Sequence, residues 1–514
     1  MRIAQHIFRK DIRRLWWEST VTLAILAALT WADRWRNDYT PGTMEGWLNL
    51  LLPFAWAYLI ALVVLEDPLV GDRQFWVTLP CRWPSIFAAK ALFILALIHI
   101  PYLVSCSVIL GARGFPPINY LPQLFGKQLA LVVCLTLPAA ALATVVRNVV
   151  QFLLAIILLG VAATLMSHGQ GMLDALWIPV NYVHNAVTLV VLTAGTLTVV
   201  CLQYVRRATS LARAAGAAAV IATAMTYAWL PQPRTLELQC ALDSRKTVGE
   251  PLSIHFSAGQ GQPADLGRRM PATPSRVTLA IPVALSGLTD QTRVYLNQLA
   301  LQVDTTEGKH YSATLATSRS EYETLPLVAF LELAGPGHAR QILRMERALF
   351  DQIKDSTTTI RGTVKADSHR ADAAVTVPIG GRVLAPGLGV CSSAIVQLRP
   401  GEDGLKVVCE SPTDIPSGGA VTLMAANRNS WGERLGSAMT FVGYPRNTWL
   451  SPMNRRDAFF HLTAEDVSGR AGSRWLVPVS AVSGGHILVT PERTACDMIT
   501  YELKGIRLSD YLVR

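Results

Sequence analysis

The chain of 514 residues lacks the common signatures of a catalytic site. It contains no G-x-x-x-x-G-K-[ST] phosphate loop, no H-E-x-x-H zinc motif and no G-x-S-x-G nucleophile elbow. It also has no C-x-x-C pair and no His-x-x-x-His spacing, which are the usual ligand patterns of a metal site. The sequence therefore predicts a protein that is not an enzyme, that binds no metal or cofactor itself and that hydrolyses no ATP through a P-loop of its own.

Charged residues are scarce, and their placement excludes one class of partner. Only 16% of residues are charged against 51% hydrophobic, and the mean hydropathy is +0.32, which is unusual for a soluble chain. Residues 1–230 hold 16 Lys and Arg against 9 Asp and Glu, whereas residues 231–514 hold 30 against 27. No basic stripe with interleaved aromatic residues is present in the second half, so we expect no nucleic-acid binding.

Long apolar runs are confined to the first 230 residues. A bilayer core of about 30 Å requires roughly 20 mostly apolar residues per helix, and seven runs approach this length. The first contains Glu18 and the last is rich in alanine, so these two are the least apolar. The seven runs are Leu15 to Trp31, Trp47 to Leu65, Ile86 to Leu110, Gln128 to Val146, Val149 to Met166, Ala186 to Tyr204 and Ala214 to Leu230.

The basic residues also predict an orientation. Short loops rich in Lys and Arg stay in the cytoplasm. The N-terminal segment is basic, and no small-x-small cleavage site precedes Asp33, so we expect a cytoplasmic N-terminus and a retained first helix. The loops carrying Arg73, Arg147 and Arg206 then also lie inside. Seven spans place residues 231–514 outside, in keeping with a protein of the bacterial inner membrane.

The segment before the first run has apolar residues at helical spacing, with Arg and Lys between them. This pattern is typical of a helix lying in the headgroup plane. A basic tail that only satisfies the charge rule is the alternative. The apolar residues concerned are Ile3, Ile7, Phe8, Ile12, Leu15 and Trp16.

The second half has the pattern of a β-rich region with two sandwich-like modules, at 231–383 and 384–514. Short alternating or apolar runs are separated by Gly, Pro, Asp and Ser clusters, as in sandwich strands. One helical interlude is predicted over His338 to Lys354, where apolar residues recur on one face. The predicted strands are Arg276 to Ala284, Arg293 to Val303, Thr359 to Val364, Ala373 to Pro378, Val390 to Leu398, Leu405 to Cys409, Ala420 to Ala425, Ala438 to Val442 and Gly485 to Val489.

Four of the eight cysteines lie in the second half: Cys240, Cys391, Cys409 and Cys496. In an oxidising compartment they permit two disulfides in three connectivities. Cys391 and Cys409 flank the predicted hairpin turn at Pro400 to Gly404 almost symmetrically, so they are the favoured pair. Four ordinary buried thiols are the alternative reading.

The segment from Glu66 to Lys90, between the second and third apolar runs, carries the most specific pattern in the chain. An acidic residue closes the second run, a polar stretch with glycine follows, and a Leu-Pro turn with a basic residue leads to a lysine at the next run. Here the chain resembles type-2 ABC (ATP-binding cassette) transporter permeases. The matching residues are Glu66, Gly71, Arg73, Leu79, Pro80, Arg82 and Lys90.

The resemblance implies that this loop docks on a separate cytoplasmic ATPase subunit, which would use the ATP. It also implies a homodimer or heterodimer of permeases surrounded by membrane lipid. Phe75, Trp76, Val77 and Leu79 supply apolar area suited to a partner contact, although an interfacial aromatic belt would use Trp76 as well. The sparse polar residues in the runs favour export of an amphipathic or lipid-linked cargo.

Two alternatives stay open. The membrane half could instead anchor a sensor or scaffold whose exported β-domains bind an envelope partner. An enzyme in the exported half is the least favoured, because no nucleophile, base and orienting group can be recognised together. Within the apolar region, His99 and His184 have no obvious carboxylate partner, so their roles are left open.

Overall fold

The computed structural model describes most of the chain, and by its contacts the chain forms two compact units. Unit 1 comprises Met1–Pro231, Ala374–Ile415 and Gly419–Pro491; unit 2 comprises Gln232–Ala373, Pro416–Gly418 and Glu492–Arg514. The domain boundaries predicted near 231 and 384 stay predictions. The described residues are 2–34, 43–66, 83–168, 182–229, 232–243, 252–257, 275–287, 292–313, 326–335, 338–399, 402–412, 417–424, 430–435, 450–463, 476–482 and 484–513.

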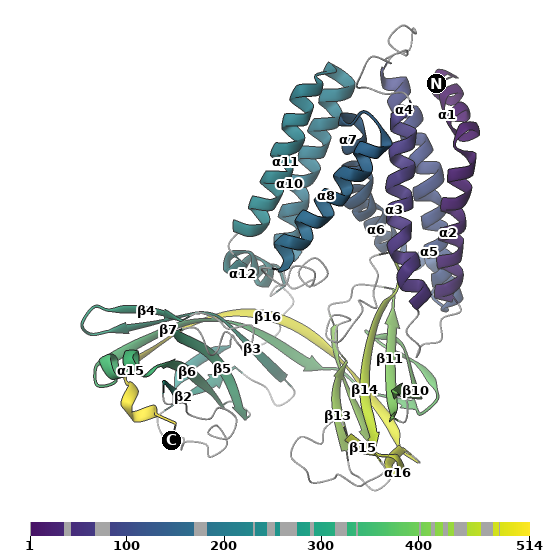
Figure 1. Cartoon of the computed structure of the whole chain (residues 1–514). Helices are drawn as coiled ribbons and strands as arrows, with labels where there is room; N and C mark the ends of the chain where they lie inside the picture. The colour runs from purple at the N-terminus through teal and green to yellow at the C-terminus, as the bar shows by residue number, and fades with distance from the viewer. Residues whose placement is uncertain are drawn as a thin grey trace. The chain divides into compact units, whose positions relative to one another are not determined.

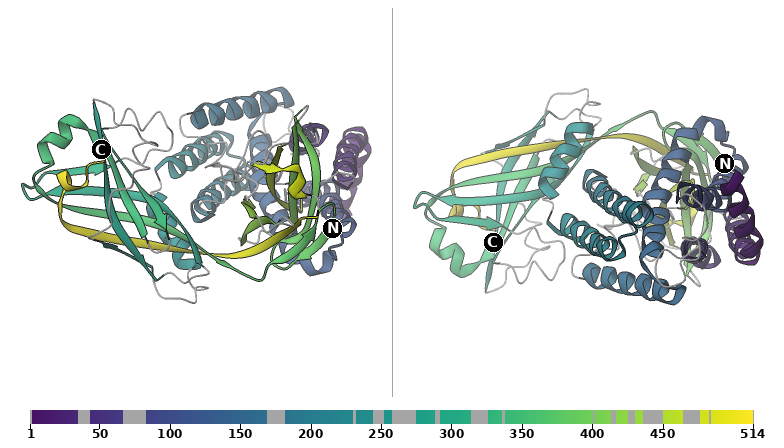
Figure 2. Two further views of the ribbon diagram at one scale, coloured as in Figure 1. Left: turned by 90° about the horizontal axis from the view of Figure 1, so that it is seen from below. Right: turned by 90° about the horizontal axis from the view of Figure 1, so that it is seen from above.

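The N-terminal part of unit 1 is a bundle of helices that cover all seven predicted apolar runs (Figures 1 and 2). The helices are α1 (Arg2–Arg14), α2 (Trp16–Arg34), α3 (Thr43–Leu65), α4 (Trp83–Ile94), α5 (Ile100–Ala112), α6 (Leu121–Leu131), α7 (Leu137–Val145), α8 (Val149–His168), α10 (Tyr182–Cys201) and α11 (Thr209–Trp229). A short 3-10 turn, η3 (Pro117–Tyr120), precedes α6.

Four helical stretches are long and apolar enough to cross a bilayer: Trp47–Leu65, Trp83–Ala112, Pro117–Val145 and Ala186–Arg206. A fifth is obtained if α1 and α2, which meet at an angle of 75°, count as one broken span. The described residues thus support a helical region with four or five candidate spans, and the predicted seven are not confirmed.

The surface of the bundle is apolar in the way that a lipid-facing surface requires. On α8 alone, Leu154, Ile157 and Leu158 are 54%, 58% and 67% exposed, whereas soluble monomers rarely expose contiguous apolar patches of this kind. Exposed tryptophans lie near both ends of α2: Trp17 at 61% and Trp31 at 62%. Fourteen residues separate them, about 21 Å of helix, in keeping with aromatic belts at two interfaces.

Three π-helical segments interrupt this bundle: η2 (Leu95–His99), η4 (Val132–Thr136) and η5 (Leu202–Arg206). Segment η2 joins α4 to α5, and η4 joins α6 to α7. The third and fourth apolar runs, Ile86 to Leu110 and Gln128 to Val146, are therefore each formed by two α-helices joined by a wider π-helical turn.

The rest of unit 1 is a pair of sheets around one core of apolar side chains that includes Val407, Phe460 and Val489. One sheet has the order β15-β14-β11-β10-β9, and β14 with β15 is its parallel pair. The strands are β8 (Val375–Pro378), β9 (Arg382–Ala385), β10 (Gly389–Arg399), β11 (Glu402–Ser411), β12 (Ser417–Met424), β13 (Ser430–Leu435), β14 (Asn454–Thr463), β15 (Leu476–Pro478) and the start of β16 (His486–Arg507), with the short helix α16 (Val479–Val482).

Unit 2 is also a two-sheet sandwich, since side chains from both sheets form one core that includes Leu279, Leu343, Ile360 and Ile499. One sheet has the order β1-β2-β6-β5, and the other places the second part of β16 beside β7, followed by β3 and β4. The elements are α12 (Gln232–Asp243), β1 (Ser253–Phe256), β2 (Arg276–Ser286), β3 (Thr292–Thr305), β4 (His310–Ala313), β5 (Leu327–Gly335), β6 (His338–Glu346), α15 (Arg347–Ile353), β7 (Thr357–Ala371) and η8 (Leu508–Tyr511).

The predicted helix over His338 to Lys354 is wrong in its first half. Residues His338–Glu346 form β6, which pairs with β2 on one side and β5 on the other, and only Arg347–Ile353 are helical. Tertiary pairing on both edges outweighs the local helical pattern here. The predicted strand Ala438 to Val442 lies outside the described residues.

Gly362 of β7 leaves room for an aromatic ring of the neighbouring strand β16. It pairs with Tyr501 across β7 and β16, and an added Cβ would come within 2.2 Å of the tyrosine ring. The ring thus occupies the space that the missing side chain leaves. The Tyr501 hydroxyl then reaches the buried Gln341 of β6 and donates a hydrogen bond to it, which links the two sheets.

Candidate functional site

The predicted docking loop can be followed only at its two ends. Glu66 closes α3, and Lys90 lies in the middle of α4. The other predicted contact residues lie outside the described residues: Gly71, Arg73, Trp76, Leu79, Pro80 and Arg82. The geometry of the site is therefore that of the helices at the base of the loop.

Lys90 is buried and paired with a residue of the N-terminal helix. Its Nζ lies 2.9 Å from Oδ2 of Asp11, and the two side chains are 4% and 0% exposed. A charged pair out of water requires close geometry, because each ion loses its hydration. No sequence pattern indicates this partner, since Asp11 is a lone acid among the basic residues of the N-terminal segment.

Glu66 is also held by the N-terminal helix, through an ion pair with Arg14. The Glu66 side chain is 11% exposed and that of Arg14 is 68% exposed. Both described ends of the loop are thus tied to α1, one by a buried pair and the other by a pair at the surface.

Helix α1 is amphipathic, as its sequence predicts, and packs by its apolar side on the bundle. Phe8 and Ile12 lie against the main core of the bundle, and Ile7 against a smaller cluster that includes Ile86 and Val199. Its cations Arg9, Lys10 and Arg13 are exposed. The 75° angle to α2 and the exposed basic face fit a helix in the headgroup plane.

The opposite ends of the helices carry a second buried ion pair. Arg113, just after α5, lies with its Nη1 3.0 Å from Oε2 of Glu410 in β11, and both side chains are 8% exposed. Its Nη2 donates a hydrogen bond of 2.8 Å to the carbonyl oxygen of Asp33 at the end of α2. Gly389 makes room for Glu410: it has φ +87°, and a Cβ there would lie 2.0 Å from the Glu410 carbonyl oxygen.

Three more hydrogen bonds join helices α2, α5 and α6 to the segment before β14. The Tyr102 hydroxyl donates to the carbonyl oxygen of Leu450 at 2.9 Å. Lys127 Nζ donates to the carbonyl oxygen of Ser451 at 2.7 Å, and the Ser451 hydroxyl donates to Oδ2 of Asp33 at 3.3 Å. Leu450 is 2% exposed and belongs to the core of the bundle, so the β-strands of unit 1 are anchored to the helices by packing as well.

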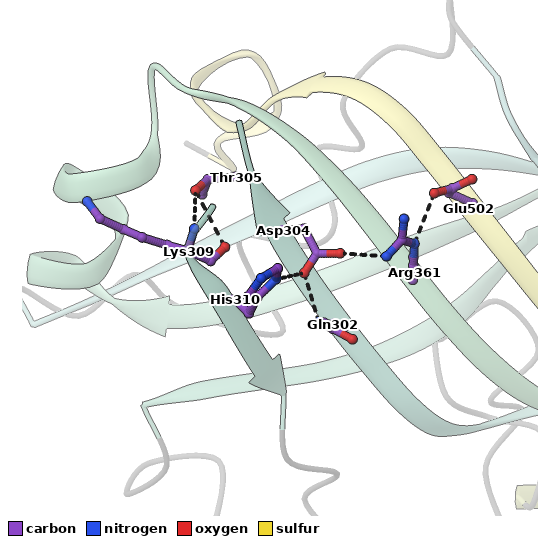
Figure 3. A network of polar contacts seen from close by, with 7 residues as sticks. All are labelled: Gln302, Asp304, Thr305, Lys309, His310, Arg361 and Glu502. Carbon is purple, nitrogen blue, oxygen red and sulfur yellow. Dashed lines mark hydrogen bonds and ion pairs between the residues drawn. The ribbon is translucent and has the colours of Figure 1, made fainter. Parts of the chain in front are cut away.

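Unit 2 carries a separate polar network on the outer face of β3, β4, β7 and β16 (Figure 3). Asp304 accepts hydrogen bonds from His310 at 2.7 Å and Gln302 at 2.9 Å, and its second oxygen lies 3.1 Å from Arg361. The hydrogen bond from His310, with the charge of Arg361, lowers the pKa of Asp304. Arg361 also forms an ion pair with Glu502, with 2.9 Å between Nε and Oε1.

The pKa of Glu502 is lowered by hydrogen bonds from Lys504 and Arg361. Since His310 is 66% and Arg361 58% exposed, this network lies in solvent and aligns strands rather than enclosing a substrate. In the part of the chain that the structure describes, no three His, Cys, Asp or Glu side chains are grouped so that they could hold a metal ion.

The structure pairs Cys391 with Cys409 across β10 and β11, and Cys240 with Cys496 in unit 2. The second pair joins residues 256 positions apart, which no local pattern can indicate. The β-strands of unit 1 also form an open pocket of about 660 Å³, lined mainly by aliphatic side chains such as Ile379, Ile395 and Val479.

Comparison with known proteins gives no relative: no protein-family model, no curated protein and no solved structure matches the chain. The function is therefore inferred from the residues of this chain alone. The sequence pattern identified Glu66 and Lys90 but not their partners Arg14 and Asp11. It also did not indicate the pair of Arg113 and Glu410.

Proposed function

We propose that the chain is the membrane subunit of an ATP-driven exporter, a permease that docks on a separate cytoplasmic ATPase through the loop between α3 and α4. The observation that carries the proposal is the pairing with α1 of Glu66, which directly follows α3, and of Lys90 on α4, so that the helices on both sides of the loop are held by α1. When the helices on both sides of a loop are held together, movement of a partner bound to the loop is transmitted to the helix bundle. The residues of the loop itself match the permease pattern described above.

The orientation in the proposal agrees with where the polar groups lie. The charge rule puts the start of α1 and the loop after α3 in the cytoplasm. The β-strands of unit 1 contact the other helix ends, at Asp33, Arg113 and Lys127, which the same rule puts outside. In this proposal the chain lies in a bacterial inner membrane with its β-rich part exported.

The cargo in this proposal is amphipathic or lipid-linked. The described spans are mostly apolar, and several of their buried polar side chains bond to a neighbouring helix, as Thr30 does to Ser105 and His99 does to Gln128. Two copies, or one copy with a related subunit, would enclose a pathway in line with the preference for closed two-fold assemblies.

The test is a pull-down of the detergent-solubilised chain with an ATPase assay on the eluate. Wild type is compared with Trp76→Ala plus Arg82→Glu in the predicted docking loop. A matched control, Trp47→Ala plus Arg36→Glu, makes the same two changes on the opposite side. We expect ATPase activity with wild type and with the control, and its loss with the loop variant.

Equal activity in all three samples would leave a transporter but refute this contact. The absence of ATPase from every folded sample would refute the permease and favour the second candidate, a membrane-anchored sensor or scaffold. The apolar pocket of about 660 Å³ in the β-strands of unit 1 is the observation that favours this candidate, because it offers a binding surface for an envelope partner.

A further inference from the structure

Two of the π-helical segments, η2 and η4, are each followed by a proline at the same distance. Segment η2 ends at His99 and is followed after one residue by Pro101; η4 ends at Thr136 and is followed after one residue by Pro138. A proline inside a helix has no N–H to donate and its ring clashes with the carbonyl four residues back. A wider π-turn just before the proline relieves that clash, so both spans break their α-helix for the same reason.

The hydrogen bonds confirm the wide turns. The N–H of Ile100 donates to the carbonyl oxygen of Leu95, and the N–H of Leu137 donates to that of Val132. Both are bonds to the fifth residue back rather than the fourth. The residues at both ends of each joint have right-handed helical backbone angles, so the helix continues through each joint as a wider turn.

The two joints are bound to one another. His99 Nδ1 lies 2.8 Å from Oε1 of Gln128, and its Nε2 lies 3.2 Å from Oγ1 of Thr136. Since an amide oxygen can only accept, Nδ1 donates its proton to Gln128, and in the neutral ring Nε2 accepts from the threonine hydroxyl. Gln128 also donates to the His99 carbonyl oxygen at 3.3 Å.

The rods on one side of the joints are fastened to the β-strands of unit 1. Helix α5 donates from Tyr102 to Leu450, and α6 donates from Lys127 to Ser451. These are adjacent residues of one segment, so α5, α6 and that segment form one block.

The rods on the other side have different attachments. Helix α4 is fixed to α1 by the buried pair of Lys90 and Asp11. Helix α7 is fixed to α11, because Arg213 Nε donates to the carbonyl oxygen of Val145 at 3.0 Å. The two joints therefore lie on the border between two differently anchored blocks of the bundle.

We propose that η2 and η4 form a paired hinge within the bundle, and that the hydrogen bonds of His99 with Gln128 and Thr136 are its latch. A movement of α1 and α4 relative to the β-strands has to be absorbed where the two blocks meet. The weakest backbone there is the pair of π-turns before Pro101 and Pro138. Within the proposed permease, this hinge would connect the ATPase side to the exported strands; the hinge itself does not depend on an ATPase.

The test is hydrogen–deuterium exchange of the full chain in lipid nanodiscs, followed by mass spectrometry of peptides covering 95–100 and 132–137. Thr136→Val removes the latch hydroxyl and keeps the shape of the side chain. Thr144→Val is the matched control: Thr144 is also buried in the same span, but its hydroxyl donates within its own helix, to Ala141.

We expect Thr136→Val to speed exchange in both peptides by about fivefold, the effect of one hydrogen bond between helices. Thr144→Val and Thr136→Ser should leave both peptides at the wild-type rate. If Thr136→Val fails to fold, Gln128→Met opens the same latch from the other side of His99 and decides the matter.

Equal rates in Thr136→Val and Thr144→Val, or a rise spread over the whole bundle, would overturn the hinge. The experiment contains no ATPase, so its outcome is independent of the pull-down. If the chain binds no ATPase but shows faster exchange confined to these two peptides, the hinge is supported and only the permease proposal is refuted.

Discussion

The buried pair of Arg113 and Glu410 should be a main fastening between the helices and the β-strands of unit 1. Glu410→Gln removes the negative charge while keeping the size of the side chain, so the buried guanidinium of Arg113 loses the charge of Glu410. At 3.0 Å and an effective dielectric constant of about 20, the lost attraction is about 5 kcal/mol before solvation is counted. Removing one partner of such a pair typically costs about 3–5 kcal/mol of unfolding free energy.

The assay is pulse proteolysis of the full chain in nanodiscs over a urea series, which reports the population of the opened β-strands. With a slope of about 2 kcal/mol per molar, we expect the midpoint to fall by about 2 M urea. Asp403→Asn is the control, because it changes an exposed carboxylate on the same strand and should shift the free energy by less than about 0.5 kcal/mol.

The double variant Arg113→Met plus Glu410→Leu should recover most of the loss, since an apolar replacement of a buried pair is often neutral. Strictly additive single changes would contradict the reasoning, because they would show no coupling between the two charges. A Glu410→Gln midpoint no lower than that of Asp403→Asn would contradict it as well.

Three further predictions follow from contacts at other places. Lys90→Met should lower the free energy of unfolding by about 3–5 kcal/mol, measured by heat denaturation in nanodiscs, and an apolar replacement of its buried carboxylate partner should restore it. Gly362→Ala forces a Cβ against the ring of Tyr501 and should cost about 1–3 kcal/mol, seen as faster hydrogen exchange in β7; an unchanged rate would mean that the ring moves aside freely. Because the hydrogen bond from His310 lowers the pKa of Asp304, this carboxylate stabilises unit 2 fully above the ordinary aspartate pKa of about 3.9, and the contribution is lost as pH falls from there through the folded pKa. Hydrogen exchange in β3 between pH 6 and pH 3 should show this loss in wild type and not in Asp304→Asn.

The helices could be predicted because a long apolar run has few alternatives to a helix. Each of the seven runs forms a helix, yet only four qualify as spans outright among the described residues. Length and hydropathy are local properties, so a helix can be predicted from them without knowledge of the fold. The joints at His99 and Thr136 are different: the prolines two residues later indicate a break, but only the neighbouring span shows which residues face one another.

The strands were less predictable where their environment decides. Most predicted strands form, including the one at Arg276 that becomes β2. The helix predicted from His338 onward is wrong in its first half because the apolar residues there fit a helix as well as a strand. Pairing with β2 and β5 on either side stabilises the strand.

For the candidate site, the sequence identified Glu66 and Lys90 through a resemblance of pattern and not through their partners. The carboxylate of Asp11 is 79 positions from Lys90, and Glu410 is 297 positions from Arg113. Ion pairs over such separations leave no trace in spacing or periodicity.

The long last strand has a consequence for how the chain is made. The pairs that β16 forms with β7 join residues about 120 to 150 positions apart, and Cys496 joins Cys240 over 256 positions. Until the ribosome has released the final residues, β7 has β3 on one edge and nothing from β16 on the other, and an open strand edge invites aggregation. Such late, long-range closure is slow. Newly made chains should therefore depend on a holding chaperone, and a chain that stops before Glu492 should remain permanently in that vulnerable state.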